Sequence, residues 1–187
     1  MTATPPARRH TAAVSLLRGW EPPTSAQHVL RQEYVEHLSG HPDGLDRACR
    51  PDHLTASALV LTPDGSSVLL TLHAKAQQWF QLGGHVDPED GSLAEAATRE
   101  VLEESGLSSV AFDSEPVQLD IHKVPFCGGP GTRHLDVRFV AVADRATATA
   151  VSEESSEVAW WPAHDLPSDE ASLEELVRLA RRRLGVG

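Results

Sequence analysis

The fold prediction for this chain rests on residues Gly83 to Leu107, GGHVDPEDGSLAEAATREVLEESGL. Ser92 and Glu95 stand in capping-box spacing, which marks the start of a helix. Gly106 is the residue type that commonly adopts the left-handed conformation at a helix end. We therefore expect a helix over residues 93–105.

Three acids, Glu100, Glu103 and Glu104, share one face of this helix. At about 100° per residue they lie within an arc of roughly 100°. Glu100 and Glu104 repel each other, and all three lie where the helix dipole disfavours negative charge. A hard divalent cation, Mg²⁺ or Mn²⁺, resolves this conflict because it prefers carboxylate oxygens. The alternative is a solvated acidic face without a ligand.

Neighbouring residues add to the predicted metal site. Arg99 lies four residues before Glu103 and can hold that carboxylate bidentately. The Gly83-Gly84 turn allows backbone to approach a ligand closely. The following loop can add oxygen ligands from its acids, which are Asp87, Glu89 and Asp90. These features predict a site for a metal and phosphate groups.

The same stretch resembles the signature of the Nudix hydrolases. That signature is Gly, five spacers, Glu, seven spacers, Arg-Glu, an apolar residue, a spacer, Glu-Glu, a spacer, Gly and an apolar residue. Residues 99–107, REVLEESGL, match its second half at every position. The first half departs, because Asp90 replaces the Glu and one extra residue precedes Arg99. The likeness extends to roughly residues 53–168.

The resemblance implies an α/β (α+β) fold, an α/β/α sandwich around a central mixed β-sheet. It also implies Mg²⁺-dependent hydrolysis of a diphosphate (pyrophosphate) linkage in a nucleoside diphosphate derivative, a small-molecule substrate. By motif position, Glu100, Glu103, Glu104 and the Gly84 carbonyl are metal ligands, and Arg99 is their orienting partner. No substrate within this class is selected by the sequence.

The general base in this family is a Glu of the signature or an acid on a late loop. The late-loop candidates are Glu153, Glu154 and Glu157, and Glu154 is preferred because it lies just before the predicted strand EVAWW. Each of them can equally be a solvated loop acid.

Histidines and aromatic residues provide candidate substrate contacts. His85 follows the double Gly and can contact substrate or metal. His134 and Asp136 are two apart on a predicted strand, share a face and can line the substrate cleft. Trp79, with Phe80, can stack on a base, although core packing is the alternative. A metal-binding cluster that adds further histidines to His85 is a separate possibility, with candidates His73, His122 and His134.

Two other functions are compatible with the same fold. A nucleotide-binding sensor without turnover would not need the intact acid triad. A prenyl diphosphate isomerase needs a catalytic Cys in a characteristic motif, and neither Cys49 nor Cys127 lies in one. We therefore favour the hydrolase.

Bulk composition limits the partners. The net charge is -11 and the pI is about 5.3, which disfavours binding to nucleic acid or to an anionic membrane. The cysteines form no CxxC motif, which suits a reducing cytoplasm. No segment is long and apolar enough to span a bilayer. We expect a cytoplasmic protein.

We expect two parts in the chain. Residues 1–50 read as an N-terminal extension. Its first part, residues 1–23, reads as a flexible lead with one amphipathic piece around VSLLRGW, and a helix follows at about 24–38. The helical arm of residues 24–40 can cap the cleft or form a homodimer contact, and the dimer contact is the hypothesis because the apolar stripe of the helix needs cover. Residues 51–187 read as the Nudix-like domain, including a C-terminal helix with a capping box from Ser172 to Glu175. Predicted strands lie at 53–62, 66–72, 117–124, 134–143 and 157–161, and the first two are joined by a PDG turn.

Overall fold

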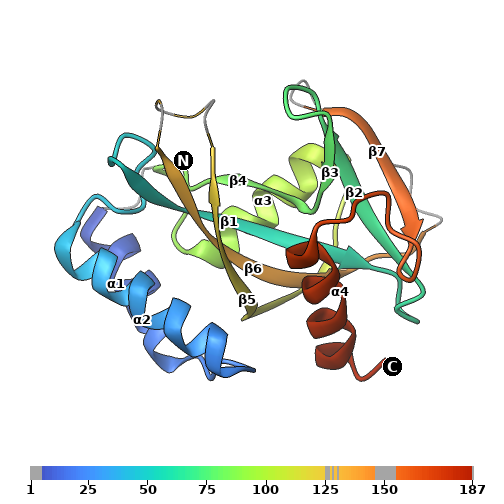
Figure 1. Cartoon of the computed structure of the whole chain (residues 1–187), viewed down its shortest axis with the longest axis horizontal. Helices are drawn as coiled ribbons and strands as arrows, with labels where there is room; N and C mark the ends of the chain where they lie inside the picture. The colour runs from blue at the N-terminus through green and yellow to red at the C-terminus, as the bar shows by residue number, and fades with distance from the viewer. Residues whose placement is uncertain (1–5, 125–126, 128, 130, 146–154, 187) are drawn as a thin grey trace.

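The computed structural model describes residues 6–124, 127, 129, 131–145 and 155–186 (Figure 1). Its helices are α1 (Pro6–Gly19), α2 (Ser25–Gly40), α3 (Leu93–Ser105) and α4 (Ala171–Leu184). Its strands are β1 (Asp52–Leu61), β2 (Ser67–His73), β3 (Gln78–Phe80), β4 (Leu82–His85), β5 (Ala111–Lys123), β6 (Arg133–Val142) and β7 (Ser155–Pro162). None of the helices in these ranges is long and apolar enough to cross a membrane.

The strands form one mixed sheet in the order β3-β2-β1-β6-β5, with β4 also paired to β1 and β7 to β2. The pairing of β1 with β6 is parallel, and the other pairings are antiparallel. The turn between β1 and β2 contains Gly65 at φ 66°, which suits the predicted PDG turn. The fold is the expected α/β/α sandwich around a central mixed sheet, with an N-terminal helical extension.

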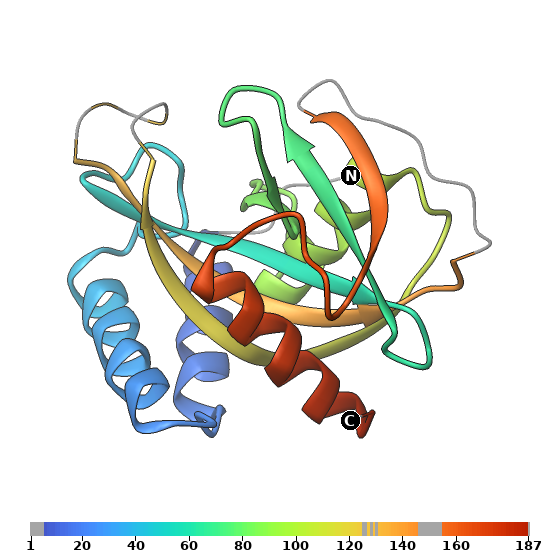
Figure 2. The ribbon, with the colours of Figure 1, turned by 45° about the vertical axis from the view of Figure 1, so that its right-hand side comes forward.

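The two faces of β1 belong to different parts of the core. Ala58 and Val60 lie in the apolar cluster that includes α3, whereas Leu59 and Leu61 lie in the cluster that includes α4. Because successive strand residues point to opposite faces, α3 and α4 cover opposite sides of the sheet. Figures 1 and 2 show α4 in front of the sheet and α3 behind it.

The N-terminal residues differ from the prediction of a flexible lead. Residues 6–19 form α1, and Leu17 on this helix is fully buried. On α2, Tyr34 and Leu38 are also fully buried in the chain's own core. Val29 on the same helix is 62% exposed, and a homodimer contact at the extension stays a prediction. The division of the chain near residue 50 stays a prediction.

Gln27 of α2 covers the outer edge of β5. Its side-chain Nε2 donates to the carbonyl of Leu119 at 2.9 Å, and its Oε1 accepts from the Leu119 backbone N–H at 2.6 Å. A side-chain amide thereby replaces a neighbouring strand at this position, and the edge is protected from pairing with another chain.

The predicted capping box of the C-terminal helix is wrong. The N-cap of α4 is Glu170, which makes no side-chain capping bond, and Glu175 pairs instead with Arg178. Ser172 lies inside the helix, and its backbone carbonyl accepts a bond from Gln118 on β5. The helix start is therefore set by packing against the sheet rather than by a local cap.

Candidate active site

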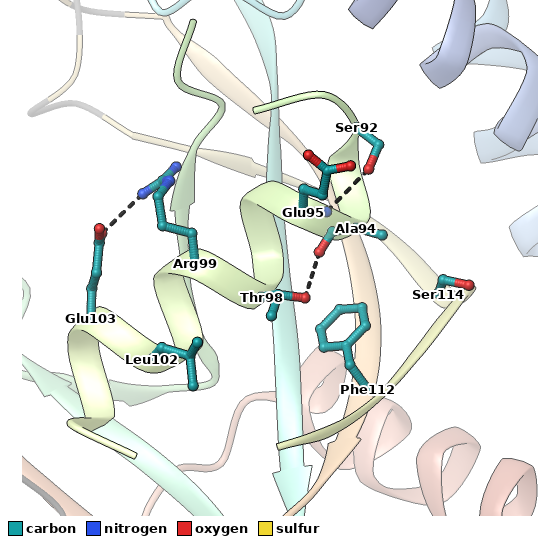
Figure 3. Close-up of a pocket in the computed structure, with 9 residues that line it drawn as sticks. All are labelled: Ser92, Ala94, Glu95, Thr98, Arg99, Leu102, Glu103, Phe112 and Ser114. Atoms are coloured by element: carbon teal, nitrogen blue, oxygen red, sulfur yellow. Dashed lines mark hydrogen bonds and ion pairs between the residues drawn. The ribbon is translucent and has the colours of Figure 1, made fainter. Parts of the chain in front are cut away.

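Helix α3 begins and ends at the residues that its sequence predicts. The Ser92 Oγ accepts from the Glu95 backbone N–H at 3.1 Å, and Gly106 ends the helix at φ 68° (Figure 3). One face of the helix packs into the core through its apolar residues. Glu100 and Glu104 thereby lie against β4, which carries the double Gly.

The two glycines of β4 allow close packing against two different elements, β1 and α3. A Cβ on Gly83 would lie 2.2 Å from the Cβ of Ser57 on β1, so only Gly fits between these strands. A Cβ on Gly84 would lie 2.6 Å from Oε1 of Glu100. The Glu104 Oε2 accepts from the Gly83 backbone N–H at 2.9 Å. Two carboxylates of α3 therefore converge on the backbone of the double Gly.

Arg99 connects the acids of the loop with those of the helix. Its Nε and Nη2 donate to the two carboxylate oxygens of Asp90 at 3.1 and 2.9 Å. Its Nη1 donates to Glu100 at 2.9 Å and to Glu103 at 3.0 Å. The bidentate contact predicted for Glu103 is thus made with Asp90 instead. Asp90 is 6% exposed and also accepts from the Asp87 backbone N–H at 2.7 Å, so it anchors Arg99.

The loop between β4 and α3 is held from both sides. Arg99 Nη2 donates to the His85 carbonyl at 2.9 Å. From the extension, Arg9 donates to the Asp87 carbonyl at 3.1 Å and pairs with Asp46 at 3.0 Å. Arg9 is 4% exposed, so the extension packs directly against this loop.

The acids differ in their surroundings. Glu100 is 17% exposed, whereas Glu103 is 60% exposed. Burial raises the pKa of Glu100, the charges of Glu103 and Asp87 raise it further, and the bonds from Arg99 oppose this effect. Positive charge beside Glu100 would therefore be favourable. The donors that meet here are oxygens, which a hard cation such as Mg²⁺ or Mn²⁺ prefers, so the residues fit such an ion.

A groove lies along one flank of α3 (Figure 3). Its walls are formed by Ser92, Ala94, Glu95, Thr98, Arg99, Leu102, Glu103, Phe112 and Ser114. Gly84, Glu100 and Glu104 are not part of these walls. The groove therefore lies beside the carboxylate cluster and shares with it only Arg99 and Glu103.

A second group of side chains forms around two predicted residues, His85 and His134. Their ring centroids lie 5.0 Å apart, and His53 lies 5.2 Å from His85 and 4.9 Å from His134. The Cys127 Sγ lies 3.4 Å from Nε2 of His85. We name these four residues the His/Cys cluster. Burial and then the nearby Arg47 and His53 lower the pKa of His85 to about 4.

The other two histidines proposed for this cluster, His73 and His122, are not among its four residues. His73 contacts the edge of Phe80, and His122 borders His134 at 5.5 Å and bonds to Asp120. Burial and then the neighbouring histidines lower the pKa of His134 to about 2. His53 was not predicted as a member of this cluster. The sequence does carry a signal for it, because HLT at residues 53–55 and HLD at residues 134–136 both open a predicted strand with His-Leu. Cys127 had no such signal.

Asp136 lies in a buried polar network. It is 3% exposed and accepts bonds from Thr55 at 2.9 Å, Ser57 at 2.6 Å and Arg138 at 3.0 Å. The Gln81 side chain donates to it at 3.2 Å. These contacts fix the polar face of the sheet next to the His/Cys cluster. Contact of Asp136 with a substrate stays a prediction.

The remaining predicted residues are Trp79 and the three acids proposed as general base. Trp79 packs edge-on against Trp161 at 5.3 Å and joins the core on the α4 side. Glu157 is exposed on β7. Glu153 and Glu154 lie outside the described residues, so the role of Glu154 as general base stays a prediction.

Comparison with known proteins gives a consistent assignment. A family model described as the NUDIX domain matches residues 51–180. An Ap4A hydrolase of C. elegans matches with a TM-score of 0.61 and 19% identity, covering 71% of this chain and 97% of that one. A NUDIX-family hydrolase from Clostridium perfringens matches with a TM-score of 0.54 and 26% identity, covering 72% and 97%.

A third solved structure is the NUDIX domain of Shewanella oneidensis NrtR complexed with ADP ribose. It matches with a TM-score of 0.56 and 23% identity, covering 80% of this chain and 97% of that one. No curated protein matches the sequence. The family model spans more than half of the chain and includes the whole carboxylate site. The chain therefore belongs to the NUDIX family and is a Nudix-type hydrolase.

Proposed function

We propose that this protein hydrolyses the diphosphate linkage of a nucleoside diphosphate derivative in a reaction that depends on Mg²⁺, with Mn²⁺ as an alternative ion. The observation that carries the proposal is the convergence of Glu100 and Glu104 on the Gly83-Gly84 backbone. The ligands would be the Gly84 carbonyl and the carboxylates of Glu100, Glu103 and Glu104. The chemistry supplied by a bound Mg²⁺ is charge screening, polarisation of a phosphoryl oxygen and a lower pKa for the attacking water.

The chain's own residues prepare this site before a ligand arrives. Arg99 holds Glu100 and Glu103 in fixed directions, and Asp90 holds Arg99. Fixed carboxylates need little reorganisation during the reaction, which lowers its barrier. The tight fit of Gly84 beneath Glu100 leaves no room for a side chain that would separate the two ligands.

Two comparisons support a nucleotide substrate with linked phosphates. One matched structure is an Ap4A hydrolase, and another holds ADP ribose. Both ligands contain a phosphoanhydride linkage attached to adenosine. Within this class we propose no single substrate.

The proposal includes a general base that deprotonates the attacking water. Glu154 is the preferred candidate on the loop before β7, with Glu153 and Glu157 as alternatives. A base must lie within hydrogen-bond reach of the water that it deprotonates. Substitution of each acid by Gln, followed by measurement of kcat against pH, identifies the base as the variant that loses the acid-side limb of the profile.

The function is tested by product release from a panel of dinucleoside polyphosphates, nucleotide sugars, ADP ribose and oxidised nucleotides. Wild type is assayed with Mg²⁺ and with chelator, and Glu104→Gln is assayed in parallel. We expect metal-dependent turnover that falls by at least about 100-fold in Glu104→Gln, since one transition-state interaction of this kind is worth that much.

Glu95→Gln is the matched control, because Glu95 is on the same helix and its carboxylate accepts a bond from Gly91 N–H, which an amide oxygen can replace. It should keep near wild-type turnover. Equal turnover in wild type and Glu104→Gln would contradict the proposal. Nucleotide binding without any turnover would support the nucleotide-binding sensor instead.

A further inference from the structure

The His/Cys cluster brings four potential metal ligands together from separate elements. His53 comes from β1, His85 from β4 and His134 from β6, while Cys127 lies on the connection between β5 and β6. One ligand atom from each residue lies within 4.8 Å of all the others. These residues are not the carboxylates of the proposed hydrolytic site.

The spacing of the ligand atoms suits a tetrahedral ion. With Zn–N near 2.0–2.1 Å and Zn–S near 2.3 Å, adjacent N and S ligands of a tetrahedron lie about 3.5 Å apart. The Cys127 Sγ lies 3.4 Å from Nε2 of His85 and 3.9 Å from Nε2 of His53. Only small side-chain movements would bring all four atoms onto one ion.

The surroundings orient the rings for such an ion. The Nδ1 of His53 lies 3.3 Å from the Cys49 carbonyl, so this nitrogen can donate its proton there and leave Nε2 free to bind. The Nε2 of His134 is buried and has no hydrogen-bond partner among the described residues. An unpaired buried nitrogen is costly, and coordination would satisfy it. His53 is fully buried, and Cys127 is 8% exposed.

We propose that His53, His85, Cys127 and His134 bind one Zn²⁺ ion as a structural site. Three imidazoles and one thiolate suit a borderline-soft ion, whereas Mg²⁺ prefers oxygen. Four protein ligands fill the tetrahedron and leave no position for a substrate. Binding releases the thiol proton of Cys127, and the ion fastens β1, β4 and β6 to the β5–β6 connection.

The site would also support the carboxylate cluster through β4. The ring of His85 belongs to the His/Cys cluster, while its backbone carbonyl accepts from Arg99 and its neighbour is Gly84. Zinc binding would therefore fix the strand that presents the double Gly to α3. This role is one of stability and position and is independent of whether the protein hydrolyses diphosphates.

The first test measures metal in wild-type protein purified under reducing conditions. We expect about one zinc per chain by elemental mass spectrometry. In protein prepared without zinc, titration with Co²⁺ should produce a thiolate-to-cobalt charge-transfer band and the visible absorption bands of tetrahedral Co²⁺. Added Zn²⁺ should then displace the Co²⁺ and remove these bands. Absence of zinc together with absence of these bands would overturn the proposal.

Variants assign the signal to its residues. Cys127→Ser and His134→Gln should bind Zn²⁺ at least about 100-fold more weakly than wild type. Removal of a group that supports a metal ligand already lowers metal affinity by about 10- to 100-fold, and removal of the ligand itself should lower it more. Cys49→Ser is the matched control, because its side chain is outside the cluster, and it should keep the cobalt band. Glu100→Gln should also keep the band. A thiolate-to-cobalt band that is still present in Cys127→Ser would contradict the assignment of Cys127 as a ligand, even if another ion site exists.

Chelation of the wild type covers the case in which a ligand variant fails to fold. A zinc-selective chelator should lower the Tm, and added Zn²⁺ should restore it whereas added Mg²⁺ should not. A Tm that is unchanged by zinc removal would contradict the structural role.

Discussion

The carboxylate of Glu100 occupies the place where a side chain on Gly84 would begin. A Cβ on Gly84 would lie 2.6 Å from Oε1 and 2.8 Å from Oε2 of Glu100. Gly83, one residue earlier, instead faces the backbone of β1, where an added Cβ would lie 2.5 Å from the Cα of Ser57. The two glycines are thus required for different reasons.

We expect Gly84→Ala and Gly83→Ala to fail in different ways. In Gly84→Ala the Glu100 side chain can move aside, so the protein should fold but bind Mg²⁺ about 10- to 100-fold more weakly. In Gly83→Ala the clash is with backbone, so unfolding free energy should fall by roughly 1–3 kcal/mol or more. Isothermal titration with Mg²⁺ and urea denaturation of both variants separate the effects. Equal losses of stability would refute this distinction.

Asp90 should be needed for both stability and metal affinity because it anchors Arg99. Asp90→Asn removes the negative charge and should cost about 1.5–3 kcal/mol in unfolding free energy. Asp90→Glu should also be less stable than wild type, although it keeps the charge. Both carboxylate oxygens of Asp90 are already bonded and the residue is only 6% exposed, so a longer side chain would overpack its surroundings. Thermal melts with and without Mg²⁺ measure both effects, with exposed Asp165→Asn as control. Wild-type behaviour of Asp90→Glu would show that the site has room.

Gln27→Ala should destabilise the extension and the edge of β5 together. The substitution leaves a buried N–H and a buried C=O of Leu119 without their side-chain partner, at a cost of about 1–3 kcal/mol. Gln32→Ala on the same helix is the control, since the bond of the Gln32 side chain is to exposed His28. Hydrogen exchange at Leu119 should rise in Gln27→Ala alone. Unchanged protection there would mean that another group covers this edge.

The pair formed by Asp52 and Arg133 should make stability depend on pH. Burial alone would raise the pKa of Asp52, but the Arg133 guanidinium outweighs burial and holds this pKa below its usual value. The contribution of this pair to the free energy of unfolding is therefore present above the pKa of Asp52 in the unfolded chain, about 3.9. It is lost as the pH falls through the lower pKa of Asp52 in the folded protein. Arg133→Met should cost roughly 0.5–1 kcal/mol at pH 7, because Arg133 is 39% exposed.

Urea denaturation at pH 7 and at pH values below 4 tests this expectation. The difference between wild type and Arg133→Met should shrink as Asp52 becomes protonated in the folded protein. Arg178→Met is a control at an exposed helix pair. A difference that grows at acid pH would have the wrong sign for this pair.

Some predictions from sequence depended on signals that lie close together in the chain. The capping box at Ser92 and the stop at Gly106 gave the correct limits of α3. The PDG turn correctly joined β1 to β2. Local signals failed where burial decided the outcome. Residues 6–19 carry weak helix signals, but α1 forms because Leu17 packs into the core. Strands β3 and β4 were not predicted because they are too short to show an alternating pattern.

The central helix, its acidic face and the family could be predicted from the sequence, because these features arise from residues a few positions apart. The contacts of Asp90 with Arg99 and of His53 with His134 became apparent only in the folded structure. The second contact depends on parallel pairing of β1 with β6, strands that are distant in the chain. Bonds between residues close in the chain do not set this register, which is specified when the apolar residues of the strands are buried in the folded protein.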